Sequence, residues 1–316
     1  MGTVTKTLGT LALSLTSGCV TSPQPSLEHQ SNIQPLPVED DSLNRFYSLH
    51  YLFDDPQRLD ALANFYSATL TSLDVEDPYR HLVLIEAFDR TPLGIPILAG
   101  GGHGYLIDDC GLVLTVNHIT RRARSFRIWD QEGNIYDASL SDFFDFKNDY
   151  ALLAAETHRP PSPHPLPIAP GFSAGTPLRF STFFARLPHR TSYRTSGPYD
   201  ECSFLPSSFF WEGEVLSLDQ ILEGVSRLDT TMTPERVTEL VHNLEPCLDS
   251  SFFFSSTVCH GYSGTPVFDA GNRFLGIAHS YIPTPPFRAL GGYGIAVHSQ
   301  QIFDGLRNYL IDHGKL

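Results

Sequence analysis

The sequence predicts an all-β protein of antiparallel strands, arranged as a sandwich or a barrel. From residue 81 onward, turn residues (Gly, Asp or Asn) bound short apolar runs such as LVLIEAF, HGYLID, GLVLTV, FRIWD and NIYDASL. Similar runs return near the C-terminus as FFFSSTV, TPVFD, RFLGIAHS and YGIAVHS. Because helical patterns do not alternate with these runs, a parallel βα arrangement is not expected.

The composition indicates a folded chain with an acidic surface. Hydrophobic residues make up 41% and charged residues 18% of the 316 residues, which is enough for a sizeable core in one large domain or two small ones. The formal net charge is −14 and no cluster of Lys and Arg occurs, so a nucleic-acid partner is not expected. The spacings C-x-x-C and H-E-x-x-H are absent, so we expect no metal site and no cofactor.

The N-terminus has the pattern of an export signal. Residues 1–19 hold one Lys and a short apolar run, which is too short to span a bilayer, followed by small residues. Thr16 to Cys19 resembles a bacterial lipoprotein cleavage box, although Leu15 lies four positions before Cys19 instead of three. A lipid anchor on Cys19 and an ordinary signal peptide both remain open, and both predict the cell envelope or the exterior. Residues 20–42 are polar and rich in proline, as in a flexible linker.

Three helices are expected outside the strands. Asp55 is a suitable N-cap with Pro56 in the first turn, Thr233 to Glu235 opens a helix within an insertion at about 200–250, and the last helix spans about 300–312. Apolar residues at helical spacing predict the buried faces. These are Leu59, Leu62, Tyr66 and Leu70, then Val237, Leu240, Val241 and Leu244, then Ile302, Leu306 and Tyr309 or Leu310.

Ser263, in HGYSGTPVF, is a candidate nucleophile. Gly, Ser and Pro also mark ordinary turns, so a purely structural role is the alternative. A serine hydroxyl needs a base, an acid that orients the base, and donors for the oxyanion. Glycines on both sides of Tyr262 and Ser263 would let the amides of Gly261 and Ser263 converge on one point.

His118 and Asp149 are the candidate base and acid. His118 follows the apolar run GLVLTV, and Asp149 precedes the apolar run YALL, where a buried carboxylate needs a partner. A structural His and a turn Asp are the alternatives, and Asp142 and Asp145 are rival acids in more irregular stretches. The order His, Asp, Ser is that of the chymotrypsin-type triad.

Several segments resemble trypsin-like serine peptidases, closest to the bacterial Deg/HtrA and V8-like type without a PDZ domain. GHGYLIDDCGLVLTVNHIT resembles the segment that presents the catalytic His, and NDYALLAAE resembles the strand that carries the Asp. HGYSGTPVFDAGNRFLGIAHS resembles the nucleophile loop with its two strands, and YGIAVHSQQIFDGL resembles the closing strand and last helix. The resemblance covers roughly residues 81–312, with no match in the middle.

This resemblance implies a peptidase domain over 43–316, with two six-stranded antiparallel barrels at about 81–165 and 166–298. It implies Ser263 as nucleophile, His118 as base, Asp149 as orienting acid, and the Gly261 and Ser263 amides as the oxyanion hole. The implied substrate-binding residues are Thr257 at the base of the primary pocket and the strand His279, Ser280 and Tyr281. Glu-specific relatives add a His on that strand, but His279 falls one residue too late, which reverses its face.

The expected function is that of a serine endopeptidase that cleaves proteins or peptides through an acyl-enzyme. An inactive protease-fold protein that binds a partner at the cell envelope is the alternative, and an esterase is a third. Tyr262 stands where animal enzymes have the Asp that pairs with a new N-terminus, so that activation is not expected. The absence of a PDZ-like region after the last helix argues against a peptide-gated trimer. The oligomeric state stays open, as does the choice between free thiols and disulfides for Cys110, Cys202, Cys247 and Cys259.

Overall fold

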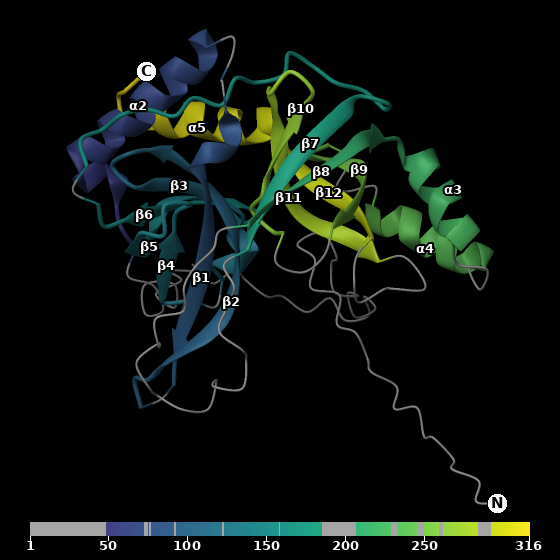
Figure 1. The fold of residues 1–316 in the computed structure, drawn as a ribbon, viewed down its shortest axis with the longest axis horizontal. Coiled ribbons are helices and arrows are strands. Elements are labelled where there is room, and N and C mark those ends of the chain that lie inside the picture. Colours follow the sequence, from purple (N-terminus) through teal and green to yellow (C-terminus); the bar gives the residue numbers. More distant parts are fainter. Residues whose placement is uncertain are drawn as a thin grey trace, which may run out of the picture.

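The fold contains two closed barrels of six antiparallel strands each (Figure 1). In this computed structural model the described residues are 49–72, 75, 77–91, 93–121, 123–157, 159–184, 207–228, 233–244, 249–258, 262–283 and 292–316. The barrels confirm the predicted all-β class and fit a chymotrypsin-like fold.

The first barrel has the strand order β1-β2-β3-β6-β5-β4. Its strands are β1 (Leu82–Arg90), β2 (Pro96–Asp108), β3 (Leu112–Thr115), β4 (Ser125–Trp129), β5 (Ile135–Asp145) and β6 (Tyr150–Ala155). Both β3 and β6 are buried at every position, because each has barrel interior on one side and covering elements on the other. Near-continuous apolar sequence is what such doubly covered strands require.

The second barrel has the strand order β10-β11-β12-β9-β8-β7. Its strands are β7 (Pro177–Phe184), β8 (Ser207–Leu216), β9 (Ser251–Val258), β10 (Pro266–Asp269), β11 (Phe274–Pro283) and β12 (Gly292–His298). Aromatic rings fill much of its interior. Phe180, for example, meets Phe254 edge-on with the ring centroids 5.7 Å apart. Rings in this geometry favour a fixed packing over a loose one.

Two helices lie together across the first barrel in Figure 1, namely α2 (Pro56–Thr71) and α5 (Ser299–Asp312). The Phe303 ring on α5 lies 5.9 Å from the Phe65 ring on α2, so the helix that ends the chain packs on the one that precedes the barrels. The Asp55 side chain accepts a hydrogen bond from the Arg58 N–H at 3.2 Å, which confirms the predicted cap.

The predicted buried face of α2 is correct at three positions and wrong at Leu70, which is 59% exposed. The buried face centres on Leu62, Phe65 and Thr69, and Leu70 lies about 100° farther around the helix than Thr69. The hydroxyl of Thr69 also accepts a hydrogen bond from the Leu166 N–H at 3.1 Å. A polar residue therefore takes the inner position because it has a backbone partner there.

The insertion contains two helices, α3 (Leu218–Leu228) and α4 (Pro234–Leu244). The helix predicted from Thr233 to Glu235 is confirmed as α4, whereas α3 was not predicted. Both pack on the outer side of the second barrel, away from the first barrel in Figure 1. An apolar cluster joins residues of the two helices to residues of strands β9, β11 and β12. Its members are Ile221, Val225, Leu244, Phe253, Ile282 and Ile295.

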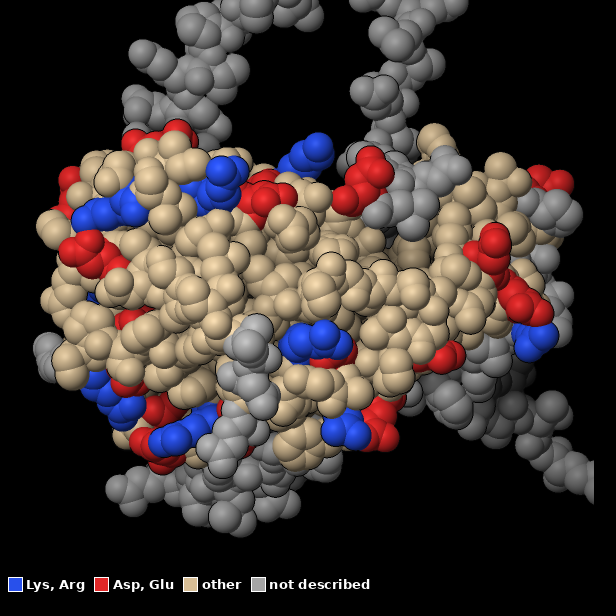
Figure 2. All heavy atoms as spheres, turned by 90° about the horizontal axis from the view of Figure 1, so that it is seen from above, with Lys and Arg blue, Asp and Glu red and all other residues tan. Residues whose placement is uncertain are grey.

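Charges on the face shown in Figure 2 are of mixed sign and scattered around a broad uncharged area. No basic stripe is visible on that face, in agreement with the composition. None of the helices in the described ranges is both long enough and apolar enough to cross a membrane.

Candidate active site

His118 lies in a short 3₁₀ helix, η3 (Asn117–Ile119), directly after strand β3. The chain leaves the buried strand and turns at once, and two hydrogen bonds hold this turn. The Asn117 N–H donates to the carbonyl oxygen of Asp149 at 3.2 Å, and the His118 N–H donates to Asp149 Oδ1 at 2.8 Å. The imidazole is therefore fixed by the same residue that contacts its ring.

Asp149 ends a tight turn that precedes β6. Its φ is 57°, in the left-handed region that Asp tolerates better than most side chains. The Asp145 carboxylate holds the turn by accepting from the N–H groups of Lys147 at 2.7 Å and Asn148 at 3.0 Å. The Asp149 side chain is thereby directed inward and is only 4% exposed.

Ser263 lies in the loop between β9 and β10, held by its two neighbours. Tyr262 is buried in the second barrel, with its ring 6.1 Å from that of Phe180. Gly264 has φ +87°, and its N–H donates to the Ala278 carbonyl at 2.8 Å. A buried anchor on one side and a left-handed glycine on the other leave the Ser263 side chain at the bend.

Glycines also allow the two barrels to approach each other here. The N–H of His103 on β2 donates to the Ser263 carbonyl at 2.7 Å. A Cβ on Gly102 would overlap that same carbonyl, and a Cβ on Gly264 would overlap the carbonyl of His103. The glycine-rich run in β2 therefore has a structural reason, since any side chain at Gly102 would separate the barrels.

The three side chains form one line across the barrel interface. His118 Nδ1 lies 2.7 Å from Asp149 Oδ2, and His118 Nε2 lies 2.9 Å from Ser263 Oγ. A carboxylate only accepts hydrogen bonds, so Nδ1 carries the ring proton in the neutral imidazole and Nε2 accepts from the serine hydroxyl. This arrangement suits removal of the Ser263 proton by His118.

The electrostatics favour an ionised Asp149. Burial alone raises the pKa of this carboxyl, but the hydrogen bond from His118, the nearby His279 ring and the charge of both rings hold its pKa well below the usual range. The carboxylate is thus charged at neutral pH and keeps the His118 proton on Nδ1.

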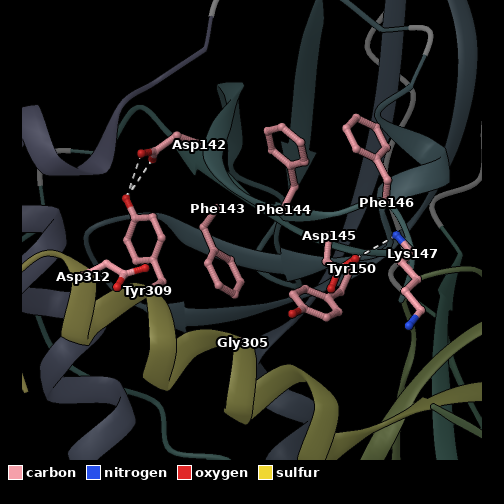
Figure 3. A pocket seen from close by; sticks show the side chains of 10 residues that line it. All are labelled: Asp142, Phe143, Phe144, Asp145, Phe146, Lys147, Tyr150, Gly305, Tyr309 and Asp312. Atoms are coloured by element: carbon pink, nitrogen blue, oxygen red, sulfur yellow. Dashed lines mark hydrogen bonds between the residues drawn. The ribbon is translucent and has the colours of Figure 1, made fainter. Parts of the chain in front are cut away.

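The two rival acids are engaged elsewhere. Asp142 accepts from the Tyr309 hydroxyl at 2.9 Å and from the Leu52 N–H at 2.9 Å, so it joins β5 to α5 and to the short helix η1 (Leu52–Asp54). Figure 3 shows the Tyr309 contact at the edge of a hollow of about 490 Å³. Neither His118 nor Ser263 lines this hollow, which lies between α5 and the strand ends around the Asp149 turn.

The His279 side chain reaches Asp149. Its side chain is buried at 3% exposure, with Nδ1 at 3.5 Å from Asp149 Oδ2. The preceding residue, Ala278, packs in the apolar cluster of the second barrel. We did not predict the contact between His279 and Asp149. No local pattern in FLGIAHS shows which residue lies opposite the His279 side chain.

Several predicted residues stay untested by the structure. Gly261 lies outside the described residues, as do Cys19, Cys202, Cys247 and Cys259, and the Thr257 side chain on β9 is not described. Backbone pairing of a substrate with His279, Ser280 and Tyr281 also stays a prediction.

Cys110 is a free thiol and buried, so of the two alternatives for this residue the free thiol is correct. Burial is the main reason why the pKa of its thiol rises to about 12. No group of three or more His, Cys, Asp or Glu in the described part of the chain has the geometry to hold a metal ion.

No known family model matches this chain, and no curated protein is similar to it. Its function therefore has to be argued from the fold and from the geometry of the three side chains.

Proposed function

We propose that the protein is a serine endopeptidase that uses Ser263, His118 and Asp149. The observation that carries this proposal is the unbroken line from Asp149 Oδ2 through the His118 ring to Ser263 Oγ, with contacts of 2.7 and 2.9 Å. A base and an oriented nucleophile in this geometry are the requirements for acyl transfer.

In the proposed first step, Ser263 Oγ bonds to the carbonyl carbon of the scissile peptide while its proton moves to His118 Nε2. The C–N bond then breaks, the Nε2 proton goes to the leaving amine, and an acyl-enzyme remains. Water attacks this ester in the second step, giving its proton to Nε2, and the Ser263 oxygen leaves with that proton. Asp149 stabilises the imidazolium in both steps without taking its proton. The amides of Gly261 and Ser263 are proposed as donors to the tetrahedral oxyanion.

A peptide substrate fits the edge of β11. Strand β10 pairs with β11 only between Phe274 and Ile277, and the Ala278 N–H bonds to Thr265 just beyond. Farther along, β11 pairs with β12 on its other side, including Ser280 with Ile295. An extended substrate chain would pair with β11 along the part of its edge that β10 does not cover. Thr257, six residues before Ser263, is proposed at the base of the primary pocket.

The decisive experiment is covalent labelling of the purified protein with a fluorophosphonate probe. The unmodified protein is expected to label once, and Ser263→Ala to remain unlabelled. The His118→Ala variant is expected to lose about four orders of magnitude or more in labelling rate, as triad variants do. Ser226→Ala, on the exposed face of α3, is the matched control and should label normally. Full labelling of Ser263→Ala would reject the proposal.

Cleavage assays then separate the remaining alternatives. Hydrolysis of a casein substrate by the unmodified chain, lost in Ser263→Ala, supports an endopeptidase, whereas cleavage of ester substrates alone would indicate an esterase. An inactive binding protein would require an insertion that covers or distorts the active site. The described part of that insertion packs on the outer side of the second barrel.

We also propose export, based on residues 1–19. The mass of the mature N-terminus distinguishes lipid-modified Cys19 from simple cleavage. An unprocessed Met1 in cells would contradict both.

A further inference from the structure

Asp149 has a second histidine beside it. His279 Nδ1 lies 3.5 Å from Asp149 Oδ2, the same oxygen that His118 Nδ1 contacts at 2.7 Å. The other ring nitrogen, Nε2, lies 3.4 Å from the hydroxyl of Ser251 on β9. Both His279 contacts are long, but the side chain is 3% exposed, so water does not replace them.

The backbone explains why His279 is aimed at the interface. The register between β11 and β12 shifts between Ala278 and Ser280, which makes His279 the extra residue of a β-bulge. Bulges bend a strand and re-aim a side chain, and they often lie beside active sites. The Asp149 carboxylate is thus contacted by one histidine from each barrel.

We propose that His279 is a positioning residue that donates its Nδ1 proton toward Asp149 and thereby fixes the charge and direction of this carboxylate for His118. This inference rests on the proposed function and adds one residue to its machinery. A buried carboxylate can only accept hydrogen bonds, so His279 Nδ1, which faces it, must carry a proton. The Ser251 hydroxyl can serve Nε2 as donor or as acceptor.

His118 and His279 share the negative charge of the Asp149 carboxylate, and this determines how the loss of His279 affects His118. Among the described residues, His118 and His279 are the titratable groups that act on the Asp149 carboxylate. A second donor takes up part of the negative charge that would otherwise stabilise the His118 imidazolium. Removing that donor while Asp149 stays ionised must therefore leave more of this charge to stabilise the His118 imidazolium.

The first test uses the unmodified protein and needs no activity. Nitrogen-15 NMR of the ring nitrogens reports which one carries a proton, and His279 is assigned by the signal lost in His279→Asn. The proposal expects a proton on His279 Nδ1 from pH 6 to 8. A neutral ring protonated only on Nε2 would overturn it, because a bare nitrogen would then face the carboxylate.

The second test compares His279→Leu, which has no donor, with His279→Asn, whose amide nitrogen sits close to the Nδ1 position. The pH at which labelling reaches half of its maximal rate is expected to move upward in the Leu variant and to stay near its original position in the Asn variant. The fluorophosphonate labelling rate should fall roughly three- to tenfold with Leu, since the contact is long, and recover with Asn. Identical pH profiles of labelling in all three proteins would refute the role.

The two tests separate this inference from the proposed function. If the unmodified protein does not label, the hydrolase proposal fails while the NMR data still decide the role of His279. If His279→Leu does not fold, the protonation of Nδ1 and the behaviour of His279→Asn decide it.

Discussion

Replacing Gly264 by alanine tests whether the approach of the two barrels sets the position of Ser263. The Gly264 φ is +87°, and a Cβ there would overlap the His103 carbonyl and lie 2.6 Å from Thr115 Oγ1. Both atoms belong to the first barrel and are engaged with each other through a 2.7 Å hydrogen bond. Neither has an easy way to move aside.

The expected cost has two parts. An alanine in the left-handed region costs about 1–2 kcal/mol. Overpacking a tight contact adds about 1–3 kcal/mol, so the free energy of unfolding should fall by about 2–5 kcal/mol in total. Gly133→Ala is the matched control, because Gly133 has φ +85° in an exposed turn and a Cβ there meets nothing within 4 Å. The control therefore bears only the cost of the left-handed conformation and none of the cost of overpacking.

The assay is urea denaturation of both variants, followed by fluorophosphonate labelling. A displacement of Ser263 by about 1 Å should slow labelling roughly a hundredfold in Gly264→Ala and leave Gly133→Ala unaffected. If both variants lose the same free energy of unfolding and label at the same rate, the barrels do not meet as tightly as described.

Three further predictions concern stability and reactivity. Leu62→Ala should cost about 2–5 kcal/mol in urea denaturation, whereas Leu70→Ala should change stability by less than about 0.5 kcal/mol; equal effects would contradict the exposure of Leu70. Cys110 should be alkylated by iodoacetamide only after denaturation, as read by peptide mass mapping, because its thiol is buried; rapid alkylation of the folded protein would contradict this. Burial is the main cause that lowers the pKa of His81 to about 4, and repulsion from the stacked His164 ring and from Arg80 adds to it. An unfolded His takes up a proton near pH 6.5, so the free energy of unfolding should decrease as the pH drops from about 6.5 to 4. His81→Phe should make this decrease smaller, and the lowered pKa values of His164 and His298 account for the part that remains.

Much of the fold was predictable because it depends on local patterns. Short apolar runs between turn residues predicted antiparallel strands, and capping residues with helical spacing predicted the starts of α2 and α4. The four-residue apolar run directly after Asp149 marked a buried strand, which is β6. Period and turn chemistry act over a few residues, so the sequence shows them directly.

The unpredicted features depend on which surfaces face each other. Thr69 is buried in place of Leu70 because the Leu166 N–H, in the segment between β6 and β7, donates a hydrogen bond to its hydroxyl. Helix α3 was missed in a stretch that otherwise looked irregular, although its apolar face packs on the second barrel.

The sequence by itself determined the strand class and the candidates Ser263, His118 and Asp149, because each lies in a recognisable local setting. Only the tertiary structure decided that they meet, since His118 and Ser263 are 145 residues apart and belong to different barrels. It also decided that His279 faces Asp149. Such contacts are set by the closure of two barrels and by glycines that let their backbones touch, and no periodicity along one strand encodes them.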